Sequence, residues 1–497
     1  MIKKLLLLLA IFAYSKTNAQ VYGANNFTLC SVINPGTYTT SYGTKFSACW
    51  GWYQANKNRE YAIAGSAAGT YFVDVTNPYQ QVICDFEPGK ITGTVWREMK
   101  TYQNYCYVVS DDGGLNSFQI FDLQYLPDSV HKVHDAQTIF KRTHAVWIDG
   151  NKLYCSSVTY SDNTKSTLNI YSLATPSVPT LIRKLNQDAA FITTVHDTYA
   201  NNDTVFVSAG YGGLYTFTLT PPSYSFTQVG SLTSYVSSGY NHSSAITPNK
   251  KTLVMCDEVP AGLPVKVIDV QNLANMQVLS TYNQYAGGTP HNPWTVNDSL
   301  CFLASYCDGL QLLNIKNPNA PFLAGYFDTH PQAGGNVSSY PDPYDGLWGL
   351  YPYLPSKNIV AVDEQNGIFV LKSHLFTNTI VANDDDLPPP DGVGTSTGSL
   401  PTGINPYSYG QNIMVSPNPA NASLFIMMAD LMSTKDITFE LFDMQGRTVL
   451  KQSTLDIKGS NSNFKEINTS QFDNGIYFLR LSLDNQLIKN SKLIIAH

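Results

Sequence analysis

The feature that most constrains this fold is a segment of alternating apolar and polar residues that recurs along the chain. Seven copies occur, at residues 71–75, 119–123, 168–173, 215–219, 266–270, 312–315 and 369–372. Equivalent positions are separated by about 50 residues on average. A unit of this size cannot bury its apolar residues alone. We therefore expect consecutive units to pack against one another.

A second landmark keeps the same interval. Four histidines are separated by 52, 46 and 49 residues, and each precedes an apolar segment: His144, His196, His242 and His291. One interval before the first histidine lies Arg97, beside Glu98, and one interval after the last lies the region of Trp348. Two landmarks in one register indicate that the period is structural.

The content of each unit favours an all-β fold. Short β-type runs, glycine turns and Asn-Pro turns recur without helical periodicity, which is typical of a four-stranded propeller blade. We predict a seven-bladed β-propeller over residues 44–381, preceded by an N-terminal segment at 20–43. Because ring closure removes exposed sheet edges, residues 27–53 are expected to help close the first or last blade.

The two ends of the chain have different compositions from the repeats. Residues 1–19 combine lysines, a short apolar run and small residues before a cleavage point, as in a signal peptide. No later apolar run approaches the ~20 residues of a membrane helix. Residues 382–412 are rich in Pro, Gly, Ser, Thr and Asp, which predicts a flexible linker. Residues 413–497 alternate in hydrophobicity and predict a small Ig-like β-sandwich.

Motifs of the last unit resemble those of the type A C-terminal sorting domain of type IX secretion cargo. The residues that carry the resemblance are Pro417, Asn418, Pro419, Asp443, Gly446, Arg447, Gly475 and Tyr477. The resemblance implies that the type IX secretion machinery is a partner. It also implies a secreted protein, or one on the outer cell surface, after signal-peptide cleavage. An ordinary adhesive or carbohydrate-binding sandwich is the alternative.

The repeats resemble those of LVIVD-repeat propellers, in particular the choice-of-anchor B family. His144 with Trp147, the segment from His291 to Trp294, and residues 346–355 carry this resemblance. The chain departs from the pattern where Arg97 replaces a histidine. The resemblance implies a propeller and a surface location, but no particular biochemical activity.

The periodic histidines are the strongest candidates for chemistry. On a ring, His144, His196, His242 and His291 would converge on the axis, with Asp197, Glu98 and Asn292 adjacent. Imidazoles and a carboxylate suit a divalent transition metal or an anionic ligand. The alternative, more common for a residue repeated once per blade, is that each imidazole ties a loop to a neighbouring backbone. The cofactor is therefore unknown, with a divalent metal as one possibility.

Other polar and sulfur-containing groups favour structural roles. The carboxylate pairs Asp257–Glu258 and Asp363–Glu364 follow apolar strands, where turn residues are expected, although a catalytic pair across the ring is an alternative. Eight cysteines stand in the chain. An exported protein permits disulfides, and Cys30 with Cys49 and Cys84 with Cys106 are the expected pairs.

Charge and motif content narrow the function. Charged residues make up 13% and the net charge is -7, which argues against nucleic-acid binding. The chain holds no phosphate-binding loop motif and no His-Glu-x-x-His motif. We expect a module that binds a glycan or protein ligand, aided by tyrosines in loops: Tyr235, Tyr240, Tyr285, Tyr340, Tyr344 and Tyr351. The alternatives are a metal-dependent extracellular hydrolase using the axial histidines, and a structural surface or matrix component.

Overall fold

The computed structural model divides the chain into two compact units, Met1–Ser396 and Thr397–His497. In the first unit it describes residues 22–36, 38–112, 114, 116–283, 287–333 and 342–377. In the second it describes 413–416, 420–421, 423–428, 437–443, 447–453, 464–483 and 486–496. The predicted signal peptide (1–19) and linker (382–412) lie outside these residues.

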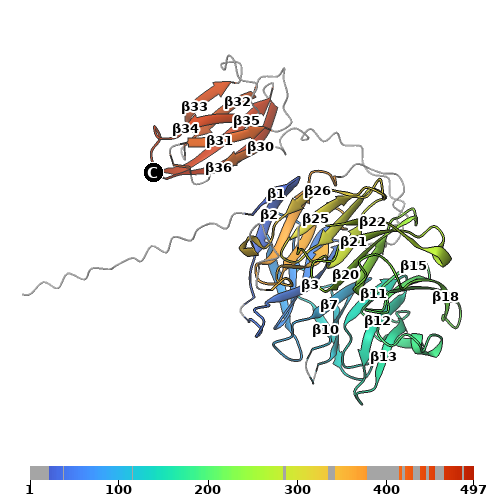
Figure 1. The fold of residues 1–497 in the computed structure, drawn as a ribbon. Helices are drawn as coiled ribbons and strands as arrows, with labels where there is room; N and C mark the ends of the chain where they lie inside the picture. Colours follow the sequence, from blue (N-terminus) through green and yellow to red (C-terminus); the bar gives the residue numbers. More distant parts are fainter. Residues whose placement is uncertain are drawn as a thin grey trace, which may run out of the picture. The chain divides into compact units, whose positions relative to one another are not determined.

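Seven antiparallel sheets follow one another through the described part of the first unit (Figure 1). The first holds β3 (Phe46–Gln54), β4 (Arg59–Ser66), β5 (Gly69–Asp74) and β6 (Val82–Pro88). The second holds β7 (Arg97–Tyr102), β8 (Tyr105–Ser110), β9 (Phe118–Asp122) and β10 (His131–Ala136). The third holds β11 (Ala145–Asp149), β12 (Lys152–Thr159), β13 (Lys165–Ser172) and β14 (Thr180–Lys184).

The remaining sheets repeat this order. The fourth holds β15 (Asp197–Asn201), β16 (Thr204–Ser208), β17 (Leu214–Thr220) and β18 (Ser225–Leu232). The fifth holds β19 (Tyr240–Ile246), β20 (Thr252–Val259), β21 (Val265–Asp269) and β22 (Gln277–Tyr282). The sixth holds β23 (Asn292–Thr295), β24 (Leu300–Ala304), β25 (Leu310–Asn314), β26 (Phe322–Phe327) and β1 (Ala24–Asn25). The seventh holds β27 (Leu347–Tyr351), β28 (Ile359–Asp363), β29 (Gly367–Ser373) and β2 (Phe27–Ile33).

Each recurring segment of the sequence lies in or overlaps the third strand of its sheet, from β5 to β29. Short 3-10 helices, η1 (Leu185–Gln187), η2 (Leu273–Asn275) and η3 (Pro331–Ala333), occur in connections. In the described residues, no helix is long and apolar enough to span a membrane.

The first strands of the seven sheets form a closed circle. Each contacts the first strand of the next sheet, from β3 through β7, β11, β15, β19 and β23 to β27, and β27 contacts β3. Strand β2 comes from the start of the chain and pairs with β29, the third strand of the seventh sheet, with Phe27 opposite Ser373 and Ile33 opposite Ile368. Figure 1 shows these blue N-terminal strands beside the orange ones. The expectation that residues 27–53 help close the ring is confirmed.

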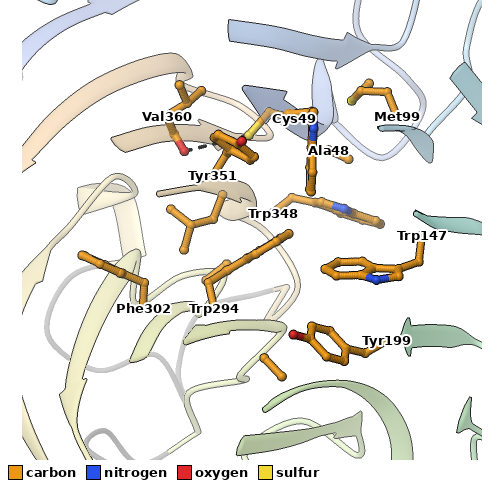
Figure 2. Close-up of a cluster of buried hydrophobic side chains, with 14 of the residues drawn as sticks. Ala48, Cys49, Met99, Trp147, Tyr199, Trp294, Phe302, Trp348, Tyr351 and Val360 are labelled. Carbon is orange, nitrogen blue, oxygen red and sulfur yellow. Dashed lines mark hydrogen bonds between the residues drawn. The ribbon is translucent and has the colours of Figure 1, made fainter. Parts of the chain in front are cut away.

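Burial decreases outward within each sheet. Nearly all of β3 and β4 is buried, whereas the outermost strand β6 is largely exposed or half-buried. Near the axis, the Trp50 ring centroid lies 6.3 Å from that of Trp147, 5.7 Å from Trp294 and 4.7 Å from Tyr351. Figure 2 shows the last three side chains pointing into one central region. Tyr351 therefore belongs to the core, and the expectation that it lies in a loop and aids ligand binding was wrong.

The cysteines are buried or half-buried thiols rather than bridges. All eight are free, so the expected pairs Cys30–Cys49 and Cys84–Cys106 were wrong. Cys49 and Cys106 lie fully inside the apolar core, where burial raises the thiol pKa of each. Small apolar volume, rather than redox chemistry, explains these two positions.

The described residues of the second unit form two antiparallel sheets. One holds β30 (Ile413–Ser416), β31 (Ser423–Met428) and β34 (Phe464–Asn468). The other holds β32 (Ile437–Phe442), β33 (Thr448–Ser453), β35 (Gly475–Leu483) and β36 (Gln486–Ile495). Leu424 and Ile467 of the first sheet share one apolar cluster with Phe439 and Leu479 of the second. The unit is thus a small two-sheet β-structure.

Closure of the ring can be tested at Gly349. A Cβ atom there would lie 2.7 Å from the Cys49 backbone nitrogen and 2.8 Å from the Ser47 carbonyl oxygen. Since backbone cannot yield as a flexible side chain does, we expect Gly349→Ala to lower the free energy of unfolding by about 1–3 kcal/mol. Denaturant unfolding would measure this. Gly114→Ala, whose Cβ meets nothing within 4 Å, is the matched control, and equal stability of the two variants would contradict closure at this seam.

Candidate functional site

Six aromatic or imidazole side chains, one from each of sheets two to seven, encircle the axis. We call this set the axial ring: Trp96, His144, His196, His242, His291 and Trp348. Neighbouring ring centroids are 6.4, 4.1, 4.1, 4.4 and 4.8 Å apart in that order, and Trp348 lies 6.5 Å from Trp96. Four of them directly precede the first strand of their sheet, whereas His242 is the third residue of β19 and Trp348 the second of β27. Ring closure therefore converts the sequence period into a spatial cluster.

The structure brings the four periodic histidines together, but it changes one neighbour. Trp96, not Arg97, continues the axial ring in the second sheet. Arg97 is buried, and its Nε donates to the Ser66 carbonyl oxygen at 3.0 Å. Successive side chains on a strand point to opposite sides. Counting one repeat interval back from His144 led to Arg97, one residue beyond Trp96, and therefore selected a side chain on the wrong side.

The Nδ1 atoms of three histidines face oxygen acceptors. His144 Nδ1 lies 2.6 Å from Asp111 Oδ2, and His196 Nδ1 lies 3.3 Å from the His242 carbonyl oxygen. His291 Nδ1 lies 3.1 Å from the Trp348 carbonyl oxygen. A carbonyl oxygen only accepts hydrogen bonds, so the Nδ1 atoms of His196 and His291 carry the proton. Their Nε2 atoms keep a lone pair.

Burial and neighbouring charges set different protonation states around the axial ring. Burial lowers the imidazole pKa of His196 and His291 well below the usual value, and nearby histidines lower it further. Burial also lowers the pKa of His242, against the opposing effect of Glu258. At His144, burial disfavours the charge, but the Asp111 carboxylate raises the pKa to about 9. At neutral pH the axial ring thus holds three neutral imidazoles and one imidazolium.

Glu258, on β20, is the carboxylate that faces these neutral imidazoles. One ligand atom from each of His196, His242 and Glu258 lies within 4.8 Å of the others. His242 Nε2 is 3.8 Å from Glu258 Oε2, and the two side chains are only 5% and 14% exposed. Tyr306 Oη donates to Glu258 Oε1 at 2.5 Å. The sequence marked Glu258 only as half of a carboxylate pair, because its approach to the histidines depends on tertiary structure.

Asp197 interacts electrostatically with His144, as expected of a residue beside the histidines, but it lies outside this group of three. It accepts a hydrogen bond from the Thr198 backbone nitrogen at 2.7 Å. Burial, followed by repulsion from Glu98, raises its carboxyl pKa to about 7. Glu98 forms an ion pair with Lys100, whose Nζ lies 4.5 Å from the Trp50 ring centroid. Asp197 is therefore coupled to a cluster of charged groups that contacts the tryptophan core.

The other member of the first carboxylate pair has a structural partner. Asp257 Oδ2 lies 2.7 Å from Lys266 Nζ, and both side chains are 0% exposed. Asp257 also accepts from Tyr235 Oη at 2.9 Å. In the second pair, Asp363 accepts from Thr329 Oγ1 at 2.9 Å. The paired carboxylates thus serve different local networks.

Tyrosines extend the aromatic surface beyond the axial ring. The Tyr240 ring lies 5.4 Å from His196 and 5.2 Å from Tyr211, and the Tyr344 ring lies 5.7 Å from Tyr306. Tyr285 and Tyr340 lie outside the described residues. Of the tyrosines expected to aid ligand binding, Tyr240 lies beside the axial ring and Tyr344 reaches it through Tyr306.

The second unit can be compared with known families. Residues 414–496 match the family of the secretion system C-terminal sorting domain. This is a sorting domain of the type IX secretion system, and it indicates export to the cell surface or secretion. In the sorting domain, Arg447 Nε donates to Asp443 Oδ2 at 2.7 Å, and Tyr477 Oη donates to the Asp473 carbonyl oxygen at 2.9 Å. Gly475 begins β35, whereas Pro417, Asn418, Pro419 and Gly446 lie outside the described residues.

Solved structures with similar architecture include PorZ, a bacterial surface component of the type IX secretion system of Porphyromonas gingivalis. It is 11% identical with a TM-score of 0.45, and the alignment covers 93% of this chain and 61% of PorZ. U3-55K is 10% identical with a TM-score of 0.46, and the alignment covers 70% of this chain and 98% of U3-55K. The WD40 propeller domain of Doa1 is 8% identical with a TM-score of 0.46, and the alignment covers 70% of this chain and 96% of that domain. No curated protein matches the chain in sequence. The fold assignment rests on the chain's own sheet topology.

The buried pair beside Glu258 can be tested by Lys266→Met. This change leaves the Asp257 carboxylate buried without its cation, so we expect a loss of about 3–5 kcal/mol in the free energy of unfolding. Denaturant unfolding would measure the loss, with Lys251→Met at an exposed position as control. Adding Asp257→Asn to the Lys266→Met variant should recover part of the lost stability. A Lys266→Met variant as stable as the control would show that the pair does not stabilise this region.

Proposed function

We propose that this chain is an exported seven-bladed β-propeller of the LVIVD-repeat, choice-of-anchor B type that binds a glycan or protein ligand. In this proposal residues 1–19 are a cleaved signal peptide. Residues 413–497 are an Ig-like sandwich that is recognised by the type IX secretion machinery. The seven consecutive sheets, each with the recurring segment in or overlapping its third strand, support the propeller assignment.

The observation that carries the binding role is the group of aromatic side chains around the axial ring. Trp96 is 38% exposed and Tyr211 is 72% exposed, and the rings of Tyr240, His196 and Trp348 continue the surface inward. Aromatic faces stack on apolar and planar groups at little cost in side-chain entropy. Such a surface suits the sugar rings of a glycan or an extended peptide.

Binding can be tested on glycan and surface-protein arrays with the purified chain. We expect Trp96→Ala combined with Tyr211→Ala to weaken binding of any array ligand about 10-fold or more, as for aromatic anchors of an interface. Tyr79→Ala is the control, because Tyr79 is 63% exposed but follows β5, away from the axial ring. Equal binding by the double variant, the control and the unmodified chain would contradict this site.

Export can be tested by deleting residues 413–497. We expect the truncated protein to remain inside the outer membrane, because the machinery would no longer have its recognition domain. Immunoblots of medium, surface and periplasmic fractions would measure this. Residues 413–497 fused to an unrelated periplasmic protein should confer export. Normal release of the truncated protein would refute the sorting role.

A further inference from the structure

We propose that His196, His242 and Glu258 bind a divalent transition-metal ion of the Zn²⁺ class on the axis of the ring. This inference goes beyond the ligand-binding proposal and does not rest on it. Two imidazoles and one carboxylate form a donor set that zinc accepts, with further coordination positions left for water or a ligand. The harder ions Ca²⁺ and Mg²⁺ favour sites built from oxygen donors.

The three donors are already close to the separation that an ion requires. Ligand atoms bound about 2.1 Å from a tetrahedral ion lie roughly 3.4 Å from each other. His242 Nε2 and Glu258 Oε2 are 3.8 Å apart, and all three donors lie within 4.8 Å. Small side-chain rotations would therefore complete the site without movement of the strands.

The surroundings turn the correct atoms toward the ion. The His242 carbonyl oxygen accepts the Nδ1 proton of His196, and this leaves the Nε2 lone pair for the metal. Tyr306 Oη holds Glu258 Oε1 and leaves Oε2 toward His242. Backbone carbonyls and hydroxyls that orient metal ligands in this way are a recurring feature of metal sites.

His242 provides an independent indication, since it is buried and, among the described residues, its Nδ1 has no hydrogen-bond partner. The imidazole interacts with the His291 backbone, whose carbonyl oxygen accepts from Ser243 Oγ at 2.5 Å. An ion at Nε2 would not satisfy Nδ1, but it would occupy the second ring nitrogen of a buried imidazole, which lies too far from Glu258 for a hydrogen bond.

The other predicted ligands have different tasks. The His144 imidazole is paired with Asp111 at 2.6 Å, and Asp197 interacts with the Glu98 and Lys100 group. His291 extends the axial ring beside His242 without joining the group of three. The structure thus reduces the expected set of five residues to two histidines and adds Glu258.

Tyr306 acts as a positioning residue for the carboxylate. Its φ of 40° lies in the left-handed region that non-glycine residues seldom adopt. Two backbone hydrogen bonds with Leu347, at 3.2 and 2.9 Å, hold it there. This conformation places its hydroxyl against Glu258. We therefore expect Tyr306→Phe to loosen the carboxylate without removing a ligand.

The test is a titration of the purified full-length chain, freed of metal by a chelator, with Zn²⁺ and with Co²⁺ as a spectroscopic probe. We expect one tightly bound equivalent and the visible absorption of a low-symmetry Co²⁺ site. His242→Ala and Glu258→Gln should each weaken Zn²⁺ binding about 100-fold or more, since each deletes one of three protein ligands. Tyr306→Phe should weaken it roughly 10- to 100-fold, the range for residues that orient ligands.

His131→Ala is the matched control, because His131 is exposed on β10 and its loss should leave Zn²⁺ affinity and the Co²⁺ spectrum unchanged. Thermal unfolding in the presence of chelator verifies that each variant is folded. If a site variant fails to fold, Tyr306→Phe and the Co²⁺ spectrum of the unmodified chain still decide. Failure of the unmodified chain to bind Zn²⁺, or binding that is equal in His242→Ala, Glu258→Gln and His131→Ala, would overturn the proposal.

Discussion

Backbone pairing between the two ends of the ring is the interaction on which the rest of the structure depends. Strand β2, from the start of the chain, supplies the outer strand of the seventh sheet, while β27 contacts β3 at the inner circle. Sheets left open at this seam would expose unpaired backbone groups. Closure satisfies those edges, and it also brings side chains that are about 50 residues apart in sequence into direct contact around one axis.

That convergence places polar and apolar groups close together along the axis. Trp50, Trp147 and Trp294 fill the core with aromatic rings, while the axial ring gathers imidazoles whose pKa values are lowered mainly by burial. Neutral imidazoles avoid the mutual repulsion that four charged ones would suffer in a poorly hydrated space. Only His144, beside Asp111, has a pKa well above neutrality. The arrangement therefore provides lone pairs rather than positive charge.

Much of this could be predicted from the sequence, because the period and the alternation of apolar residues are local patterns. They located the recurring strands and the convergence of the four histidines. They did not place Trp96, because a slip of one residue moves a side chain to the other face of a strand. They also did not reveal Glu258 as a partner of His242, since that contact depends on the end of β20 returning to the axis. The expected disulfides failed because spacing says nothing about whether two thiols face each other.

In our proposal, ring closure assembles a metal site from His196, His242 and Glu258. Anomalous diffraction at the zinc edge, from crystals of the protein grown with Zn²⁺, tests it most directly. We expect one strong peak in contact with Nε2 of both histidines and an oxygen of Glu258. A zinc peak bound to other residues, or no peak at these three residues in crystals grown with excess Zn²⁺, would contradict the proposed site.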